Sequence, residues 1–261
     1  MLKYIFISSF IAPIMPIFIT FLVWRGLINI FKISRIIEHS IIIISYKHVE
    51  EQKGKEEADK LFLFGQEANH KTLAFGRMNL YIHDIRNAKV AFGDTLLYPK
   101  FKEDDGLKQF DIVIANPPWN QDGYDENVIK KGEFWKQRFR YGFVPKQSAD
   151  WVWIQHMLSS TQGKVGIVID NGCLFRGGKE RIIRSRILEE DLIECVILLP
   201  EKLFYNTGAP GAIIILNTID KKLEFQKLRK EKLEKVKKGL MNELLIGKKR
   251  LKEFTKWANM D

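Results

Sequence analysis

One stretch decides the fold of this 261-residue chain: Phe110-Asp111-Ile112-Val113-Ile114-Ala115-Asn116-Pro117-Pro118-Trp119. Its first half is a short run rich in branched apolar residues, which is typical of a buried strand in a parallel sheet. Proline fixes the backbone angle φ, so the two prolines hold the chain in a rigid turn at the end of that strand. Ligands of open α/β sheets bind beyond the carboxyl ends of the strands. We therefore expect Asn116 and the turn after it to lie at a binding site.

Short apolar runs alternate with helical patterns on both sides of this strand. The predicted strands are Leu61 to Phe64, Lys89 to Phe92, Asp111 to Ala115, Val165 to Ile169, Ile193 to Leu199 and Ala212 to Leu216. The predicted helices are Tyr46 to Lys60, His70 to Ile82, Asp150 to Ser160 and Gly178 to Glu189. This alternation predicts an α/β fold with a doubly wound, mostly parallel sheet. Polar residues are then expected at four strand ends, namely Glu67, Asp94, Asn116 and Asn171.

Composition sets the outer limits of function. The length suits one large α/β domain with a tail or a small second unit. The chain has 42 Lys and Arg against 32 Asp and Glu, a net charge of +10, which suits a polyanionic partner. A solvated basic surface without such a partner is the alternative. Cys173 and Cys195 lie far apart in the sequence, so they predict neither a disulfide framework nor a metal site, and a reducing cytosol fits best.

The sequence divides into three parts, residues 1–45, 46–217 and 218–261. The first part contains fifteen isoleucines, and its run from Tyr4 to Trp24 has no charged side chain. That run is long enough to span a membrane, but Pro13 and Pro16 would interrupt the helix, so a membrane segment is the less favoured interpretation. An off-frame or truncated start, which is not a native part of the fold, is the other.

The last part, residues 218–261, is rich in Lys and Glu. Its apolar residues recur mostly every three or four positions, at Leu233, Val236, Leu240, Leu244, Leu251 and Phe254. This spacing predicts an amphipathic helix that packs either on a partner helix or on its own domain.

The turn after the central motif suits chemistry on an amino group of a base. The Asn116 carboxamide oxygen and the Pro117 carbonyl supply two acceptors for the two N–H bonds of such an amino group. Both contacts draw the nitrogen toward tetrahedral geometry, in which its lone pair is available. Trp119 offers a flat face for a base swung out of a duplex. A turn with two prolines and no catalytic task remains the alternative.

This arrangement resembles the Asn/Asp/Ser-Pro-Pro-aromatic motif of methyltransferases that act on amino groups, and the Asn-Pro-Pro-Trp form is similar to that of N6-adenine enzymes. The same theme occurs in enzymes that methylate glutamine or ribosomal RNA guanine. Three further segments resemble, in order, the modification subunit of type I restriction-modification systems: Phe64-Gly65-Gln66-Glu67, Gly93-Asp94-Thr95-Leu96 and Leu174-Phe175-Arg176-Gly177-Gly178. The resemblance covers about residues 41–216.

The resemblance implies S-adenosylmethionine as cofactor. Glu67 is then expected to accept from the ribose hydroxyls, and Asp94, with Thr95, to accept from the adenine amino group of the cofactor. Each residue also has an ordinary interpretation, since an exposed glutamate can begin a helix and Gly-Asp-Thr is a common turn.

The resemblance also implies the other site residues. The catalytic residues are expected to be Asn116, Pro117, Pro118 and Trp119. Four residues are expected to meet DNA phosphate at the amino end of a helix: Arg176, Gly177, Gly178 and Arg181. A tight turn before a solvated basic face is the alternative for this second group. No metal is expected.

The sequence departs from the family at both ends. The resemblance requires a Gly-rich loop upstream of Glu67, but Ser34 to Ser40 contain no glycine and the only glycine before residue 54 is Gly26. Because that loop would follow the central strand, we expect a loss of cofactor affinity and of a ladder partner for two neighbouring strands. At the other end, Lys232 to Arg250 resemble the C-terminal helix of the type I specificity subunit, which docks on the modification subunit.

The expected function is therefore that of a cytoplasmic, DNA adenine-N6 methyltransferase subunit of a type I restriction-modification system. Its expected partners are double-stranded DNA and the specificity, modification and restriction subunits. The first alternative is a catalytically inactive remnant that binds only DNA or these subunits. The second, a glutamine or RNA methyltransferase, explains neither Leu-Phe-Arg-Gly-Gly nor the tail. The DNA target sequence is set by specificity-subunit domains that the expected arrangement places in another chain.

Overall fold

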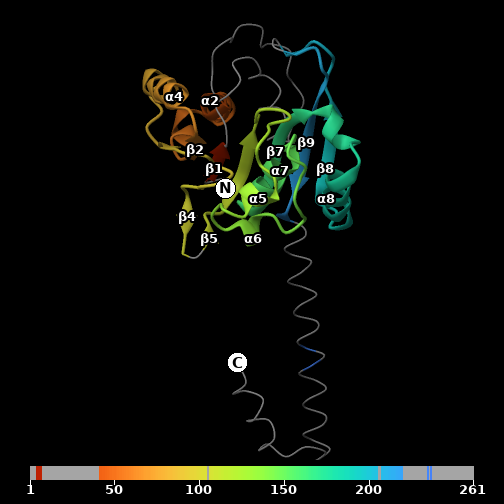
Figure 1. Ribbon diagram of the computed structural model, residues 1–261. Coiled ribbons are helices and arrows are strands. Elements are labelled where there is room, and N and C mark those ends of the chain that lie inside the picture. Colours follow the sequence, from red (N-terminus) through yellow and green to blue (C-terminus); the bar gives the residue numbers. More distant parts are fainter. Residues whose placement is uncertain are drawn as a thin grey trace, which may run out of the picture. The chain divides into compact units, whose positions relative to one another are not determined.

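The computed structural model of the chain describes residues 4–7, 41–104, 106–204 and 207–219, together with residues 234 and 236. The chain divides into two compact units, Met1–Thr218 and Ile219–Asp261. All elements named below belong to the first unit (Figure 1). Most of the predicted tail helix lies outside the described residues, and of the segment Lys232 to Arg250 only Glu234 and Val236 are described.

The strands are β1 (Tyr4–Ile7), β2 (Phe62–Glu67), β3 (Ala88–Phe92), β4 (Lys102–Glu103), β5 (Gly106–Leu107), β6 (Phe110–Ala115), β7 (Thr161–Asp170), β8 (Ile193–Leu198) and β9 (Gly211–Asn217). The helices are α2 (Ile41–Lys53), α3 (Lys55–Ala58), α4 (His70–Ile82), α5 (Glu126–Ile129), α6 (Trp135–Arg138), α7 (Asp150–Ser159) and α8 (Gly178–Glu189), and a 3-10 helix, η1, spans Asn171–Leu174.

Seven strands form one sheet in the order β3-β2-β1-β6-β7-β9-β8, and β4 and β5 form a separate hairpin. In this sheet β3, β2, β1, β6 and β7 run parallel to one another, whereas β9 runs antiparallel to both β7 and β8. The prediction of an α/β fold with a mostly parallel sheet is confirmed. The carboxyl ends of β2, β3, β6 and β7 consequently lie along one edge of the sheet, and the antiparallel β9 begins at that edge.

The central strand corrects one expectation. Strand β1 lies between β2 and β6 and pairs with both, with Ile7 opposite Gly65 on one side and Ile114 on the other. The expected loss of a ladder partner for these two neighbours is therefore wrong. The reason is that a four-residue apolar run close to the start of the sequence forms the strand, whereas the expectation considered only the residues just before Ile41.

The other interpretations of the first 45 residues fall mainly on residues 8–40. These residues, which include most of the run considered as a membrane segment and the stretch considered as an off-frame start, lie outside the described residues. Within the part of the chain that the structure describes, no helix combines the length and the apolar character needed to cross a membrane.

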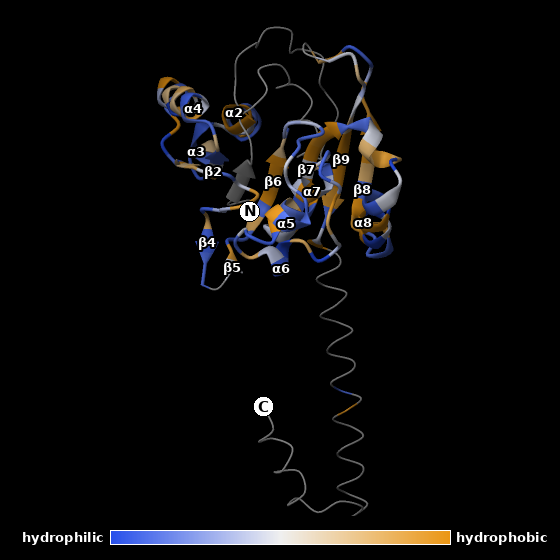
Figure 2. Cartoon of the chain, in the orientation of Figure 1, coloured by the Kyte–Doolittle hydropathy of each residue, from blue (hydrophilic) through white to orange (hydrophobic). Residues whose placement is uncertain are grey.

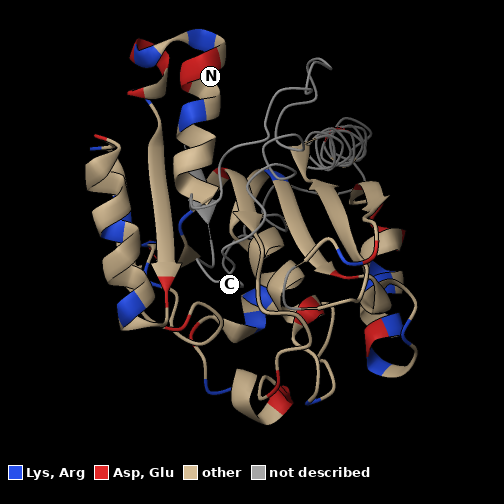
Figure 3. Cartoon of the chain, turned by 90° about the horizontal axis from the view of Figure 1, so that it is seen from above, with Lys and Arg blue, Asp and Glu red and all other residues tan. Residues whose placement is uncertain are grey.

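Two hydrophobic clusters sandwich the sheet. Along β6, Ile112 and Ile114 belong to the cluster that includes residues of α2 and α4. Val113 and Ala115 alternate with them and belong to the cluster formed with α7 and α8. Figure 2 shows the apolar character of the central strands, and Figure 3 shows that charged residues gather on the helices and loops. Helices thus cover both faces of the sheet and bury its apolar side chains, which is the doubly wound arrangement.

Local sequence signals set the helix ends. Helix α4 begins after Asn69, whose side chain accepts from the backbone N–H groups of Lys71 and Thr72, and the predicted bounds of this helix are confirmed. The predicted bounds of α8 are confirmed as well. The single helix predicted from Tyr46 to Lys60 is wrong, because Gly54, with φ of +88°, ends α2 and separates it from α3.

Candidate active site

The four polar residues predicted at strand ends meet at the carboxyl edge of the sheet. Glu67 is the last residue of β2 and pairs in register with Phe92 at the end of β3. Gly93 follows directly and donates its N–H to the Glu67 carbonyl at 3.0 Å. Asn116 follows β6, and Asn171 follows β7. The parallel register thus brings residues more than 100 positions apart in the sequence to one edge.

Glu67 is buried, with 2% of its surface exposed. Its Oε1 accepts from the backbone N–H of Asn69 at 2.7 Å, and this contact turns the carboxylate toward the start of α4. The interpretation of Glu67 as an exposed glutamate that begins a helix is wrong, because the residue closes β2 and is enclosed. A buried carboxylate at a strand end fits a ligand that offers hydroxyl donors.

Asp94 organises the turn after β3. Its Oδ1 accepts from the N–H groups of Leu96 and Leu97 at 2.8 and 3.1 Å, and its Oδ2 accepts from the Tyr124 hydroxyl at 2.8 Å. Burial, together with the charge of Asp94, raises the pKa of Tyr124 above its usual value. The ordinary turn role and the predicted ligand role therefore coexist, since each carboxylate oxygen accepts more than one hydrogen bond.

Two residues that hold the same turn were missed from the sequence. The fully buried Arg138 donates from Nη1 to the Thr95 carbonyl at 3.1 Å and from Nη2 to the Leu96 carbonyl. Burial lowers the pKa of Arg138 to about 10. Gln66, also buried, binds the Tyr98 carbonyl and the Lys100 N–H at 2.9 Å each. No local pattern marks these residues, because their partners in this turn lie 32 to 43 positions away.

Thr95 contributes to this turn through its backbone. It is buried, and its carbonyl accepts from Arg138. Its predicted contact with the cofactor stays a prediction.

The Asn-Pro-Pro-Trp turn follows β6 directly. Asn116 is 7% exposed, and none of the described residues forms a hydrogen bond with its side chain. Trp119 packs edge-on against Phe204, with ring centroids 4.5 Å apart. Its ring also lies over Gly211 at the start of β9, where an added Cβ would come within 2.9 Å of Trp119 Cη2. The turn thus holds the tryptophan at a defined position, and no described residue occupies the carboxamide.

Asn120, which follows Trp119, links this turn to α7, to β7 and to Arg176, and its role was not predicted from the sequence. Its N–H donates to Asp150 Oδ1 at 3.2 Å, and its Nδ2 donates to Asp170 Oδ2 at 3.4 Å. Its Oδ1 accepts from Arg176 Nη1 at 2.5 Å. Asn120 adopts a left-handed conformation, with φ of 50°, which asparagine tolerates better than most residues.

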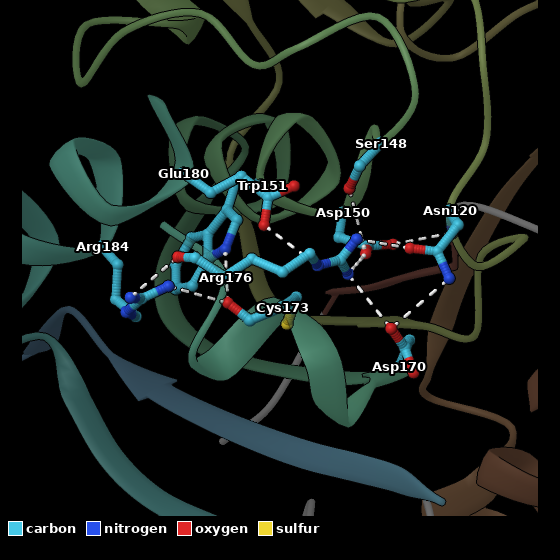
Figure 4. A network of polar contacts seen from close by, with 9 residues as sticks. All are labelled: Asn120, Ser148, Asp150, Trp151, Asp170, Cys173, Arg176, Glu180 and Arg184. Carbon is cyan, nitrogen blue, oxygen red and sulfur yellow. Dashed lines mark hydrogen bonds and ion pairs between the residues drawn. The ribbon is translucent and has the colours of Figure 1, made fainter. Parts of the chain in front are cut away.

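Arg176 is the centre of this polar network (Figure 4). Its Nη2 lies 2.7 Å from Asp150 Oδ2 and 3.1 Å from Asp170 Oδ2, and its Nε lies 3.3 Å from Glu180 Oε2. Burial raises the pKa of Asp150 to about 6, while the charge of Arg176 acts in the opposite direction. The Arg176 guanidinium thus contacts groups within the protein, and its predicted contact with DNA stays a prediction.

The other residues predicted to contact DNA lie at the surface. Gly177, Gly178 and Arg181 are exposed at the amino end of α8. Gly178 has φ of +61°, which explains why a glycine occupies this turn. Their role toward DNA stays a prediction.

The residues present fit part of the implied cofactor. Glu67 and Asp94 provide two carboxylates at neighbouring strand ends, which suits the hydroxyl and amino donors of an adenosine. A Gly-rich loop for the methionine part should follow the central strand, and the sequence after Ile7 contains no glycine before Gly26. The fit therefore extends to the adenosine part alone.

Comparison with known proteins identifies the family. The family model for N-6 DNA methylases matches residues 38–260, which is most of the chain. The chain belongs to the N-6 DNA methylase family. The match with the N-6 DNA methylases runs beyond residue 217, so it includes the segment whose sequence resembles a specificity subunit, and that second resemblance stays a prediction.

Several methylase subunits are similar in sequence. The type I restriction enzyme MjaVIII methylase subunit of Methanocaldococcus jannaschii is 53% identical over 163 residues, which cover 60% of this chain and 28% of the relative. The MjaVII methylase subunit of the same organism is 44% identical over 203 residues, which cover 74% of this chain and 34% of the relative. The chain thus spans 28% and 34% of the length of these two relatives.

Solved structures of the family share the fold. The type I restriction-modification methyltransferase subunit from Streptococcus thermophilus superposes with a TM-score of 0.59 at 24% identity, covering 82% of this chain and 39% of that one. The M protein of the type I restriction enzyme EcoKI gives a TM-score of 0.51 at 20% identity, covering 68% of this chain and 37% of that one. The sheet with its single reversed strand is thus the methyltransferase fold.

Proposed function

We propose that this N-6 DNA methylase carries the target-base site of an S-adenosylmethionine-dependent DNA adenine-N6 methyltransferase and acts as part of a type I modification subunit. The observation that carries the proposal is the Asn116 carboxamide, which follows β6 at the edge that also holds Glu67 and Asp94 and which no described residue binds. The relatives named as type I restriction enzyme methylase subunits support the same system.

In the proposed reaction the turn positions the amino group. The Asn116 carboxamide oxygen and the Pro117 carbonyl each accept one N–H of adenine N6, so the nitrogen lone pair points away from both. Pro118 keeps the turn rigid, and Trp119, held against Phe204, supports the extruded base. Bound S-adenosylmethionine supplies the methyl group, with Glu67 and Asp94, beside Thr95, holding its adenosine part.

The proposed partners follow from charge and from the relatives. The net charge of +10 favours double-stranded DNA, with Arg181 and the Gly177-Gly178 turn at the amino end of α8 as the proposed phosphate contact. The specificity, modification and restriction subunits of a type I system are the proposed protein partners, and the cytoplasm is the proposed location.

One observation favours a second candidate function, that of an inactive remnant. The sequence after β1 contains no glycine until Gly26, so the methionine part of the cofactor lacks the expected loop. Such a chain would bind DNA or partner subunits without transferring a methyl group.

Calorimetric titration of the full chain with S-adenosylmethionine decides between the two. The methyltransferase proposal expects micromolar binding that Asp94→Ala weakens by about 10- to 100-fold, because the substitution removes the acceptor for the adenine amino group. No binding up to millimolar cofactor would contradict it and favour the remnant. Glu126→Ala is a matched control, since this carboxylate lies on α5 and forms an ion pair with Lys130 instead.

A further inference from the structure

Arg176 is the residue that joins the target-base turn to the rest of the fold. Figure 4 shows its side chain extending from the side of Glu180 toward Asp150 and Asn120. Through these contacts one guanidinium connects the turn after β6 with the start of α7, the end of β7 and the first turn of α8. Its own backbone is held as well, since the Arg176 N–H donates to the Gly172 carbonyl at 3.0 Å and Arg184 donates to the Arg176 carbonyl at 3.1 Å.

Asn120 transmits this support to the motif. It directly follows Trp119, and its N–H, its Nδ2 and its Oδ1 contact Asp150, Asp170 and Arg176 respectively. Only three peptide bonds separate its nitrogen from the Pro117 carbonyl group. The two intervening residues are the rigid Pro118 and the packed Trp119. Fixing Asn120 therefore fixes the far end of a turn whose near end is already fixed by β6.

The charges around Arg176 oppose a direct contact with phosphate. Three carboxylates contact one guanidinium, and the side chains of Asp150 and Glu180 are only 0% and 2% exposed. Buried carboxylates need a compensating cation, so these groups hold the guanidinium in place. A phosphate that approached Arg176 would meet this excess of negative charge, whereas the exposed Arg181 of α8 has no such surroundings among the contacts described.

The geometry also requires an arginine. Nη1 donates to Asn120 and Nη2 donates to Asp150 and Asp170, while Nε forms no hydrogen bond with a described residue but lies within ion-pair distance of Glu180. The single ammonium group of a lysine cannot reach partners on three sides of a fixed fork.

We infer that Arg176 is a positioning residue, which anchors Asn120 and thereby sets the geometry of the Asn116 carboxamide and the Pro117 carbonyl. This inference rests on the proposed function for the role of the turn, and it goes beyond that function by assigning a residue that holds the turn from outside. It also replaces the predicted phosphate contact of Arg176 with an internal one.

The first test is independent of activity and uses amide hydrogen exchange in the full chain. Arg176→Gln removes the charge and most of the guanidinium fork. The Asn120 amide, which donates to Asp150 in the unaltered chain, should then exchange faster by at least about tenfold. Arg186→Gln is the matched control, because Arg186 is an arginine of the adjoining helix α8 that binds the Tyr141 carbonyl at 2.7 Å. Equal exchange of the Asn120 amide in both variants would overturn the inference.

Two milder variants keep the test decisive if Arg176→Gln unfolds the chain. Arg176→Lys keeps the charge without the fork, and Asn120→Gly keeps a left-handed backbone without the side-chain contacts. Each should speed exchange at the turn, and the double variant should add little to the larger single effect, because both changes remove the same link. Fully additive effects would contradict a shared link.

The second test separates positioning from phosphate binding by kinetics. Arg176→Lys should lower kcat on the order of 100-fold while KM for DNA and its salt dependence stay near those of the unaltered chain. A phosphate contact predicts instead weaker DNA binding at every sequence and a salt slope reduced by about 1. If the unaltered chain transfers no methyl group, the proposed function fails, and the exchange measurement still decides the inference.

Discussion

Two turns at the same edge of the sheet are held in different ways. In the turn after β3, Asp94 accepts hydrogen bonds from two backbone N–H groups and a tyrosine, and the buried Arg138 donates to two carbonyls of that turn. In the turn after β6, no described residue binds the Asn116 side chain, and the support reaches the motif through Asn120 at its far end.

This difference corresponds to two tasks. A turn whose polar groups are already satisfied keeps its shape without a ligand, which suits the binding of a cofactor of constant structure. A turn fixed at both ends around a carboxamide that no described residue binds suits stabilisation of a charge that develops during reaction. The predictions below are ordered from the largest expected effect to the smallest.

Asn116→Ala tests the carboxamide that no described residue binds. Loss of one preorganised acceptor should lower the rate of methyl transfer by about 100- to 1000-fold. The free energy of unfolding should change by less than about 1 kcal/mol, because no described hydrogen bond is lost. Initial rates at saturating DNA and cofactor, with thermal melting, measure both. Asn127→Ala, at an exposed position of α5, is the control, and a rate for Asn116→Ala within a few-fold of it would contradict the proposed role.

Asp94→Asn and Asp94→Ala separate the two roles of Asp94 in the turn after β3, which are holding the backbone and binding the cofactor. The asparagine keeps an acceptor for the Leu96 and Leu97 N–H groups but replaces Oδ2 by a donor. Both variants should lose about 10- to 100-fold in cofactor affinity by calorimetry, since a charged hydrogen bond is lost. The alanine should lower the free energy of unfolding more than the asparagine does, by about 1 kcal/mol, because only the alanine also loses the contacts with the Leu96 and Leu97 N–H groups. Cofactor affinity of Asp94→Asn equal to that of the unaltered chain would remove Asp94 from the cofactor site.

Gly211→Ala disturbs the target-base turn from the neighbouring strand. Its Cβ would lie 2.9 Å from both Trp119 Cη2 and Phe204 Cε2, so the tryptophan must shift. We expect a loss of about tenfold in the rate of methyl transfer, since small displacements at a reacting group are costly. Gly208→Ala is the control, because nothing lies within 4 Å of its added Cβ. Equal rates in the two variants would show that Trp119 need not keep this position.

Tyr124→Phe removes one hydrogen bond from the turn after β3. The loss of the hydrogen bond to Asp94 Oδ2 should cost about 1 kcal/mol in the free energy of unfolding. Cofactor affinity should change by less than about threefold, because Asp94 keeps both oxygens and its backbone partners. Chemical denaturation and calorimetry measure the two quantities. A tenfold loss of affinity would instead place the Tyr124 hydroxyl in contact with the cofactor.

Local sequence patterns predicted the helices that cover the sheet better than its central strand. Helices α4 and α8 begin and end at the predicted residues, because periodicity and the residues at their ends, such as Asn69 and Gly177, are local signals. Strand β1 could not be predicted in the same way. It has four residues, and its partner Phe62 lies far along the sequence from Tyr4, so only the tertiary pairing distinguishes it from the apolar residues that follow.

The candidate site shows the same division. Glu67, Asp94 and Asn116 were predictable because each follows or closes a strand with a recognisable apolar pattern. The contacts of Arg176 were not predictable, since its partners at Asn120, Asp150 and Asp170 come from separate elements. A sequence pattern shows that an arginine follows Leu-Phe, but only the fold shows that carboxylates already surround it.

The central claim is that the turn after β6 positions adenine for methylation. Mass-spectrometric analysis of nucleosides tests it most directly, with unmethylated duplex DNA incubated with S-adenosylmethionine, the full chain and the specificity subunit of its own system. The account predicts that N6-methyldeoxyadenosine forms with the unaltered chain and falls by about 100-fold or more with Asn116→Ala. No methylated nucleoside from the unaltered chain, or equal amounts from both, would contradict it.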